Sequence, residues 1–250
     1  MNRRFNFQSG NPALKKNPFA GISAGLRGQA MTVEGTVNKT VLSLVILIVS
    51  ASYTWNLGMQ GAPFMGMVMA GFIGGLIVAM ITIFKMHLAP ITTPIYAALE
   101  GLALGGISVG IEMRYPGIAS QAVFLTFGTL GALLLAYRTG VIRVTEKFKM
   151  GVFAATGGIA IVYLLSFVVG MFGVSIPLIH SSGTFGILFS LAVVVIASLN
   201  LVLDFDFIAK GAAQGAPKYM EWFGAFSLLV TLVWLYIEIL HLLSKLQSRD

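Results

Sequence analysis

The sequence predicts an all-α integral membrane protein, a bundle of seven transmembrane helices. Two observations indicate this class. The 250 residues are 57% hydrophobic and only 10% charged, whereas an ordinary soluble domain has about 25% charged residues. The apolar residues are also gathered into long runs that polar loops separate. A chain of this composition cannot cover itself with polar side chains, so part of its surface must face lipid.

Each apolar run has the length of a membrane-spanning helix, about 18–25 residues for roughly 30 Å of hydrocarbon. A segment in lipid must satisfy its own backbone hydrogen bonds, so each run is expected to be a helix and not a strand. The seven runs lie near 40–57, 64–84, 91–111, 118–137, 152–172, 183–207 and 222–244. We therefore predict one transmembrane domain over 40–246, between a tail at 1–39 and a short tail at 247–250.

The N-terminal tail is polar and basic, with Glu34 as its one acid. We expect it to be mostly disordered and not a signal peptide, because no apolar core follows near its start. Seven spans place most loop lysines and arginines on the side of this tail. They are Arg3, Arg4, Lys15, Lys16, Arg27, Lys39, Lys85, Arg138, Arg143, Lys147, Lys149, Lys210 and Lys218.

The opposite side has Arg114, Lys245 and Arg249. Cytoplasmic loops carry the excess of basic residues in membrane proteins, so we expect a cytoplasmic N-terminus and, with seven spans, an external C-terminus. One re-entrant run would instead move the C-terminus inside. Membrane orientation thus explains the net charge of +7, and we expect no nucleic-acid partner.

Small residues inside the spans are expected to set how closely the helices approach. In lipid, association depends on close packing, which small side chains allow. The glycines concerned are Gly71, Gly74, Gly75, Gly101, Gly105, Gly106, Gly157 and Gly158.

Acidic residues inside the apolar runs are the candidate functional residues. An ionised acid at the bilayer centre costs about 2.5–3.5 kcal/mol on insertion scales, so Glu100 is expected to face the bundle interior or a water-filled cavity, or to be protonated. Asp204 and Asp206 are about 200° apart on a helix. We expect the deeper Asp204 in the interior and Asp206 at the cytoplasmic helix end. Glu238 lies inside the last run, where pairing with His241 is the alternative.

Two carboxylates held together in a poorly solvated place share a proton as a unit. When both are ionised, they present the hard oxygen ligands that calcium prefers. Protons and calcium would then compete for the same atoms, which is a route to pH-gated cation passage without a cofactor.

Catalytic motifs are missing from the sequence. There is no cysteine, no nucleophile elbow and no phosphate-binding loop. The histidines His87, His180 and His241 fall at three different loops or helix ends and give no metal-binding spacing. We therefore predict that the protein is not an enzyme.

Three passages resemble the Bax inhibitor superfamily of transmembrane Bax-inhibitor-motif proteins. His87–Leu102 resembles the third-helix signature of the family, Leu203–Ile208 its sixth-helix aspartate motif, and Leu235–Leu240 its seventh-helix pattern. Residues 31–37 and the extended basic tail resemble a bacterial branch. The resemblance implies a bundle with the last helix central, in the bacterial inner membrane, and a pH-sensitive calcium leak.

The resemblance also implies which acids form the sensor of protons and calcium. The family's sensor pair corresponds to Asp204 and Glu238, which would also be the calcium ligands. From their own positions in the sequence, we expect Asp206, Glu100 and Glu221 to be supporting acids. Glu238 stands where the family has aspartate. If the last span began at Trp222, Glu238 would lie about 24 Å along it. It would then reach Asp204 only if residues 211–225 formed an interfacial segment, and Glu221 is the fallback partner.

Two other hypotheses remain open at this point. The protein could be a non-transporting membrane regulator that binds a membrane protease or stress complex, which the basic tail and the glycines fit equally well. An intramembrane enzyme is the third hypothesis, without a named substrate. The expected partners are the lipid bilayer, calcium ions and other membrane proteins.

Overall fold

The computed structural model describes residues 30–172 and 183–248, and within them it contains seven long helices and no sheet. All seven are long and apolar enough to cross a membrane, which confirms the predicted class. Each lies over one of the predicted runs. They are α2 (Val33–Met59), α3 (Met65–Phe84), α4 (Ala89–Glu112), α5 (Ile118–Arg138), α6 (Glu146–Met171), α8 (Thr184–Ala213) and α9 (Met220–Gln247).

The first helix begins earlier than its hydropathy suggests. The Thr32 side chain caps α2 by accepting a hydrogen bond from the backbone N–H of Gly35, as N-cap threonines commonly do. Residues 33–39 therefore belong to the helix and not to the tail. The rest of the predicted tail, residues 1–29, lies outside the described residues, as does His180.

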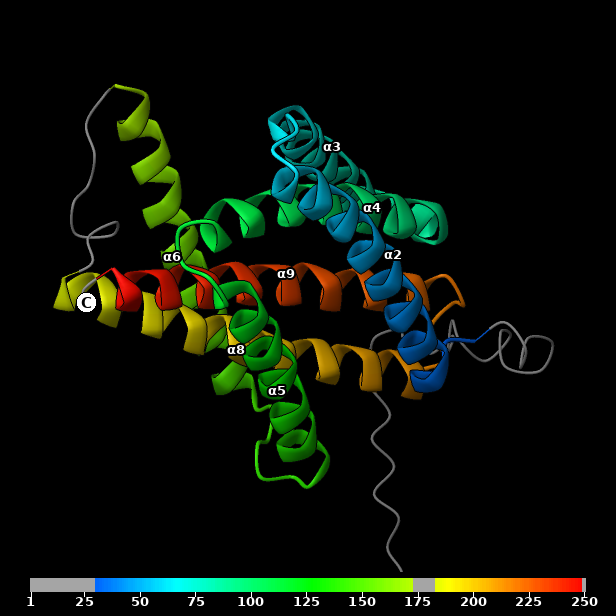
Figure 1. Cartoon of the computed structure of the whole chain (residues 1–250). Coiled ribbons are helices and arrows are strands. Elements are labelled where there is room, and N and C mark those ends of the chain that lie inside the picture. The colour runs from blue at the N-terminus through cyan, green and yellow to red at the C-terminus, as the bar shows by residue number, and fades with distance from the viewer. Residues whose placement is uncertain (1–29, 173–182, 249–250) are drawn as a thin grey trace, which may run out of the picture.

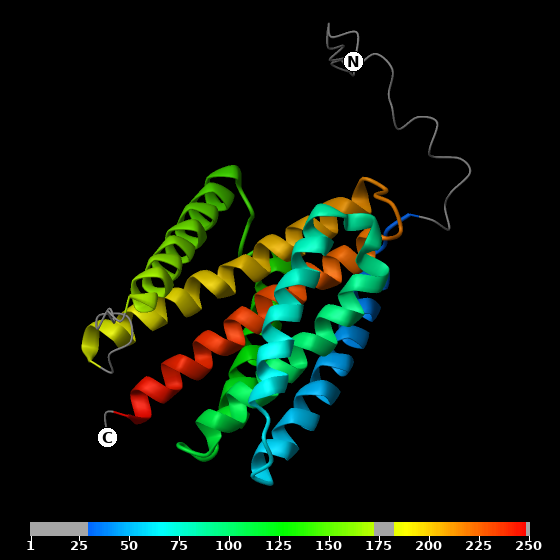
Figure 2. The same cartoon turned by 90° about the horizontal axis from the view of Figure 1, so that it is seen from above.

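The last helix is the centre of the bundle, as the family resemblance implies. It packs against α2, α4, α5 and α8, and Figure 1 shows it running through the middle of the molecule. The start of α2 and the end of α9 lie at opposite ends of the bundle (Figure 2), as seven full spans require. An isolated bridge between Ala30 and Pro217 fastens the chain before α2 to the α8–α9 loop.

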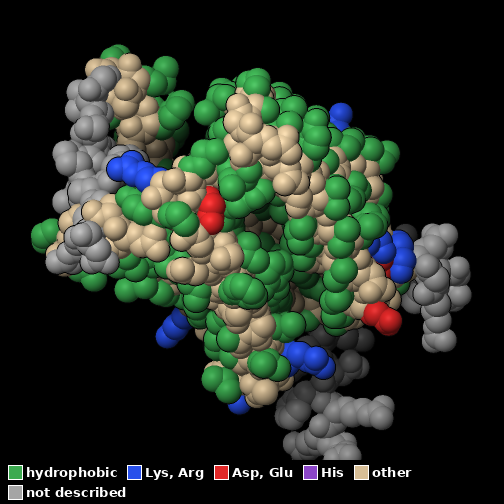
Figure 3. Space-filling view, in the orientation of Figure 1, with side chains coloured by type: hydrophobic (Ala, Val, Ile, Leu, Met, Phe, Trp, Pro, Cys, Tyr) green, Lys and Arg blue, Asp and Glu red, His purple; other side chains and the backbone are tan. Residues whose placement is uncertain are grey.

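The helix α6 is the least integrated part of the described structure. It packs mainly against α8, on the far side of α8 from α2, α3 and α4 (Figure 2). Only 6% of its apolar window is buried. Hydrophobic side chains cover most of the outer face in Figure 3, and charged ones are few, as expected for a surface in contact with lipid.

Glycines bring α4 close to its neighbours α2 and α3. A side chain at Gly101 or Gly105 would overlap the carbonyl oxygen of Leu47 or Ala51 in α2, and one at Gly71 would overlap that of Leu99 in α4. The predicted packing role is therefore confirmed for these positions. It is wrong for Gly157 and Gly158 in α6, because a side chain added at either position would meet no other part of the described chain within 4 Å.

Candidate functional site

Acidic side chains meet the central helix at three levels. Glu221 lies in its first turn and Glu238 near its far end, about 25 Å apart at 1.5 Å per residue. Between them, Asp204 of α8 contacts the middle of α9. Each of the three belongs to an apolar span, and each side chain is buried within the protein. Their partners differ, and the partners determine what each acid can do.

Asp204 is held by two hydroxyl groups of the neighbouring helix. Ser227 donates a hydrogen bond of 2.5 Å to Oδ1 and Thr231 one of 2.7 Å to Oδ2. The residue is 8% exposed, and no ion pair involves it among the described residues. Ser227 and Thr231 are four residues apart, so they occupy one face of α9. The carboxyl group of Asp204 thus links α8 to α9 without a neutralising cation.

Glu238 lies toward the end of the bundle where α9 finishes, which is opposite the end that bears the N-terminal tail. Its Oε1 accepts hydrogen bonds from the Tyr163 hydroxyl of α6, at 2.8 Å, and from the Trp234 indole, at 3.2 Å. It lines a polar crevice of about 730 Å³ between α4, α6, α8 and α9. The other lining residues are Gly110, Ile111, Arg114, Tyr115, Tyr163, Ser190, Trp234, Ile237, His241, Ser244, Lys245 and Ser248. Glu238 is therefore the acid that borders a space large enough for water and ions.

The structure does not bring Asp204 and Glu238 together. The hydrogen bonds of Asp204 meet α9 at Thr231, seven residues before Glu238 and so about 10 Å along the axis. Contact between the two acids would require residues 211–225 to form an interfacial segment. This segment is not formed, because α8 continues to Ala213 and α9 begins at Met220. The two acids therefore occupy successive levels of the bundle.

Glu221 is not a partner of Asp204 either, since it is the centre of an ionic cluster at the tail end of the bundle. Lys39 of α2 lies 2.5 Å and Lys218 of the α8–α9 loop 2.8 Å from its carboxylate oxygens. The backbone N–H and the hydroxyl of Thr32 also donate to it, at 2.9 and 2.8 Å. The side chain is fully buried, so these four contacts replace its hydration. They join α2, α9 and the loop before α9.

The two remaining candidate acids, Asp206 and Glu100, lie apart from the other three. Asp206 lies at the tail end of α8, as expected, where Lys210 approaches within 2.6 Å and Lys149 of α6 within 3.7 Å. Glu100 is half-buried in the middle of α4, with its carboxyl group packed over Gly75 of α3. Throughout 30–172 and 183–248, no group of three or more His, Cys, Asp or Glu residues is placed to hold a metal ion. Asp204 and Glu238, about two helical turns apart along α9, are not placed to bind one ion together.

Sequence reasoning identified the buried acids but missed the groups that hold them. Ser227 and Thr231 carried a usable signal, because two hydroxyl residues four apart share a helix face. Tyr163 and Lys39 carried none, since nothing in the chain indicates which turn of α6 or α2 meets α9.

The helices and the acids together define a multi-pass α-helical membrane protein with carboxyl groups buried along its central, last helix. Comparison with protein families shows which family of such proteins the chain belongs to. The family described as Bax inhibitor 1 like matches residues 11–248, and the chain belongs to this family. Comparisons with curated proteins and with solved structures found no match.

Proposed function

We propose that the protein is a pH-sensitive leak channel for calcium in the bacterial inner membrane, with its N-terminus in the cytoplasm. The observation that carries the proposal is the position of Asp204. It is a buried acid in the middle of the bundle, bound by hydroxyl groups and not by a lysine or arginine among the described residues. Acids within membrane spans commonly mark ion or proton pathways. The orientation is supported by Lys39, Lys149, Lys210 and Lys218, which gather at the tail end.

The proposed path has two successive acidic levels. A cation entering the polar crevice reaches Glu238 first and then Asp204, about two helical turns further along α9. Calcium prefers six to eight oxygen ligands, and a single carboxylate at each level provides far fewer. Each level would hold the ion weakly, which suits conduction, because a permeating ion must also leave.

Protonation of Asp204 supplies the proposed pH sensitivity. In its ionised form the carboxylate accepts two charge-assisted hydrogen bonds from α9, which are stronger than neutral ones. These bonds hold α8 against α9. A proton on Asp204 removes the charge and weakens both bonds, so the contact between the two helices loosens. We expect the leak to increase as Asp204 becomes protonated.

Calcium flux into liposomes that contain the purified protein tests this function across a pH series. Asp204→Asn is permanently neutral, so its flux should be independent of pH and match that of the protonated wild type. Asp206→Asn is the matched control, because it removes an acid two residues away that pairs with lysines, and it should keep the pH response. An unchanged response in Asp204→Asn, or no wild-type flux at any pH, would refute the proposal.

A further inference from the structure

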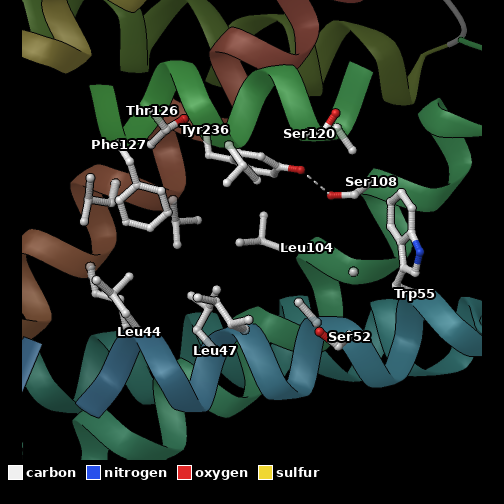
Figure 4. Close-up of a pocket in the computed structure, with 18 residues that line it drawn as sticks. Leu44, Leu47, Ser52, Trp55, Leu104, Ser108, Ser120, Thr126, Phe127 and Tyr236 are labelled. Carbon is white, nitrogen blue, oxygen red and sulfur yellow. Dashed lines mark hydrogen bonds between the residues drawn. The ribbon is translucent and has the colours of Figure 1, made fainter. Parts of the chain in front are cut away.

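A second cavity, of about 390 Å³, lies apart from the polar crevice, between α2, α4, α5 and α9. Its walls are almost entirely apolar. Leu44 and Trp55 line it from α2, Leu104 from α4, Phe127 from α5 and Tyr236 from α9 (Figure 4). The volume falls within the range of about 300–1,000 Å³ that is typical of small-molecule pockets. No acid lines this cavity, so the proposed ion pathway does not account for it.

The cavity opens sideways toward the surrounding bilayer. The helices α2 and α5 form opposite walls and lack substantial contact with each other. Ser52 on α2 and Ser120, Val123 and Phe127 on α5 line the cavity and are exposed. Every lining residue belongs to a membrane-spanning helix. The molecules that can reach this opening are therefore the lipids of the bilayer.

The length of the cavity matches one leaflet. Leu44 to Trp55 on α2 spans about 16 Å at 1.5 Å per residue, which is about half of the 30 Å hydrocarbon thickness. Apart from Leu44, which lies just before the midpoint, the α2 residues that line the cavity belong to the C-terminal half of that helix. The cavity therefore faces the leaflet at the end of the bundle where α9 finishes, and it accommodates a chain as long as that leaflet is deep.

The polarity of the lining changes along this length. Figure 4 shows Trp55, Ser52, Ser108 and Ser120 toward one end, and Leu44, with Phe127 and Thr126 across the cavity from it, toward the other. The Thr126 hydroxyl donates a hydrogen bond to the Ala122 carbonyl oxygen of its own helix, so this end offers a ligand no free polar group from Thr126. The hydroxyl groups of Ser108 and Tyr236 are hydrogen-bonded at 2.7 Å. The polar end is the one nearer the membrane surface, where tryptophan is favoured. This gradient follows that of a phospholipid, whose ester groups lie at the surface and whose chain end lies at the midplane.

We propose that this cavity is a binding site for one acyl chain of a bilayer phospholipid, which enters between α2 and α5. An apolar cavity of this kind excludes water, and a hydrocarbon chain restores the dispersion contacts that its lining would otherwise lack. The ester end lies beside Ser52 and Ser120, and the chain passes Leu104 toward Leu44. The site is independent of the proposed calcium leak.

Filling the cavity tests the proposal. The double variant Ser52→Phe/Ser120→Phe places aromatic rings on both walls. The control Val49→Phe/Leu125→Phe places the same rings on exposed positions of the same helices that do not line the cavity. After delipidation in detergent, native mass spectrometry should find about one phospholipid on the wild type and the control. Overpacking should lower retention by about tenfold or more in the filled variant. Equal retention, or a fatty acid or detergent alone on the wild type, would overturn the proposal.

A cross-linking experiment needs no variant and so remains valid if the filled protein does not fold. A phospholipid with a photoreactive group in its acyl chain is reconstituted with the wild-type protein. Leu104 is only 5% exposed, so the α4 segment around it is reached through the cavity and not from the outer surface. Adducts on this segment support the proposal. Adducts confined to outward-facing residues would overturn it.

Discussion

Replacing Gly105 by alanine tests the close contact between α4 and α2. The added methyl group would overlap the backbone carbonyl group of Ala51, which cannot rotate away as a flexible side chain can. Overpacking of this kind costs about 1–3 kcal/mol. Alanine is also favoured over glycine within a helix by about 0.5–1 kcal/mol. The steric term is the larger, so we expect a net loss of about 1–2 kcal/mol in the free energy of unfolding.

Thermal unfolding in detergent, followed by tryptophan fluorescence, measures this change. For a chain of this size, 1 kcal/mol corresponds to about 2–4 °C in Tm, so Gly105→Ala should lower Tm by several degrees. Gly157→Ala is the matched control, because that position in α6 has open space around it and gains only helix propensity. Equal shifts in the two variants, or a rise for Gly105→Ala, would refute the packing argument.

Three further predictions concern the acids. Glu221→Gln leaves two lysines without their counter-charge and should lower the free energy of unfolding by about 1–3 kcal/mol in the same assay; an unchanged Tm contradicts this. Thr231→Val removes a hydrogen bond that favours ionised Asp204, so the pH midpoint of the calcium leak should move upward; a downward move contradicts the proposed role. Tyr163→Phe removes the hydrogen bond between α6 and Glu238, so amide hydrogen exchange should accelerate in α6 and not in α9.

The seven helices were predictable because the bilayer fixes both their length and their composition. The start of α2 was not, because hydropathy averages over side chains that point in different directions. Thr36 and Thr40 are polar, yet they are 0% and 8% exposed and face the interior of the bundle. A tail was therefore predicted where the helix begins.

The candidate site was predictable only in part. The cost of a charge in lipid depends on the residue type, which the sequence gives directly. From this cost we predicted that Asp204 lies in the interior, and its side chain is buried there. The partner of Asp204 depends on the register between α8 and α9, which side-chain packing along the whole length of both helices determines. Composition contains no information on that register. The same reason explains why Gly105 and Gly157 looked equivalent in the sequence.

The cluster around Glu221 has a consequence for biosynthesis. Its partners Thr32 and Lys39 precede it by 189 and 182 residues, so they leave the ribosome long before the last helix exists. Until Glu221 has been synthesised, Lys39 lacks this ion-pair partner, and the inward-facing threonines of the first helix are not yet covered by the last helix. Completion of the last helix is therefore the event that locks the first one in place, and a truncated chain should remain open to quality-control proteases.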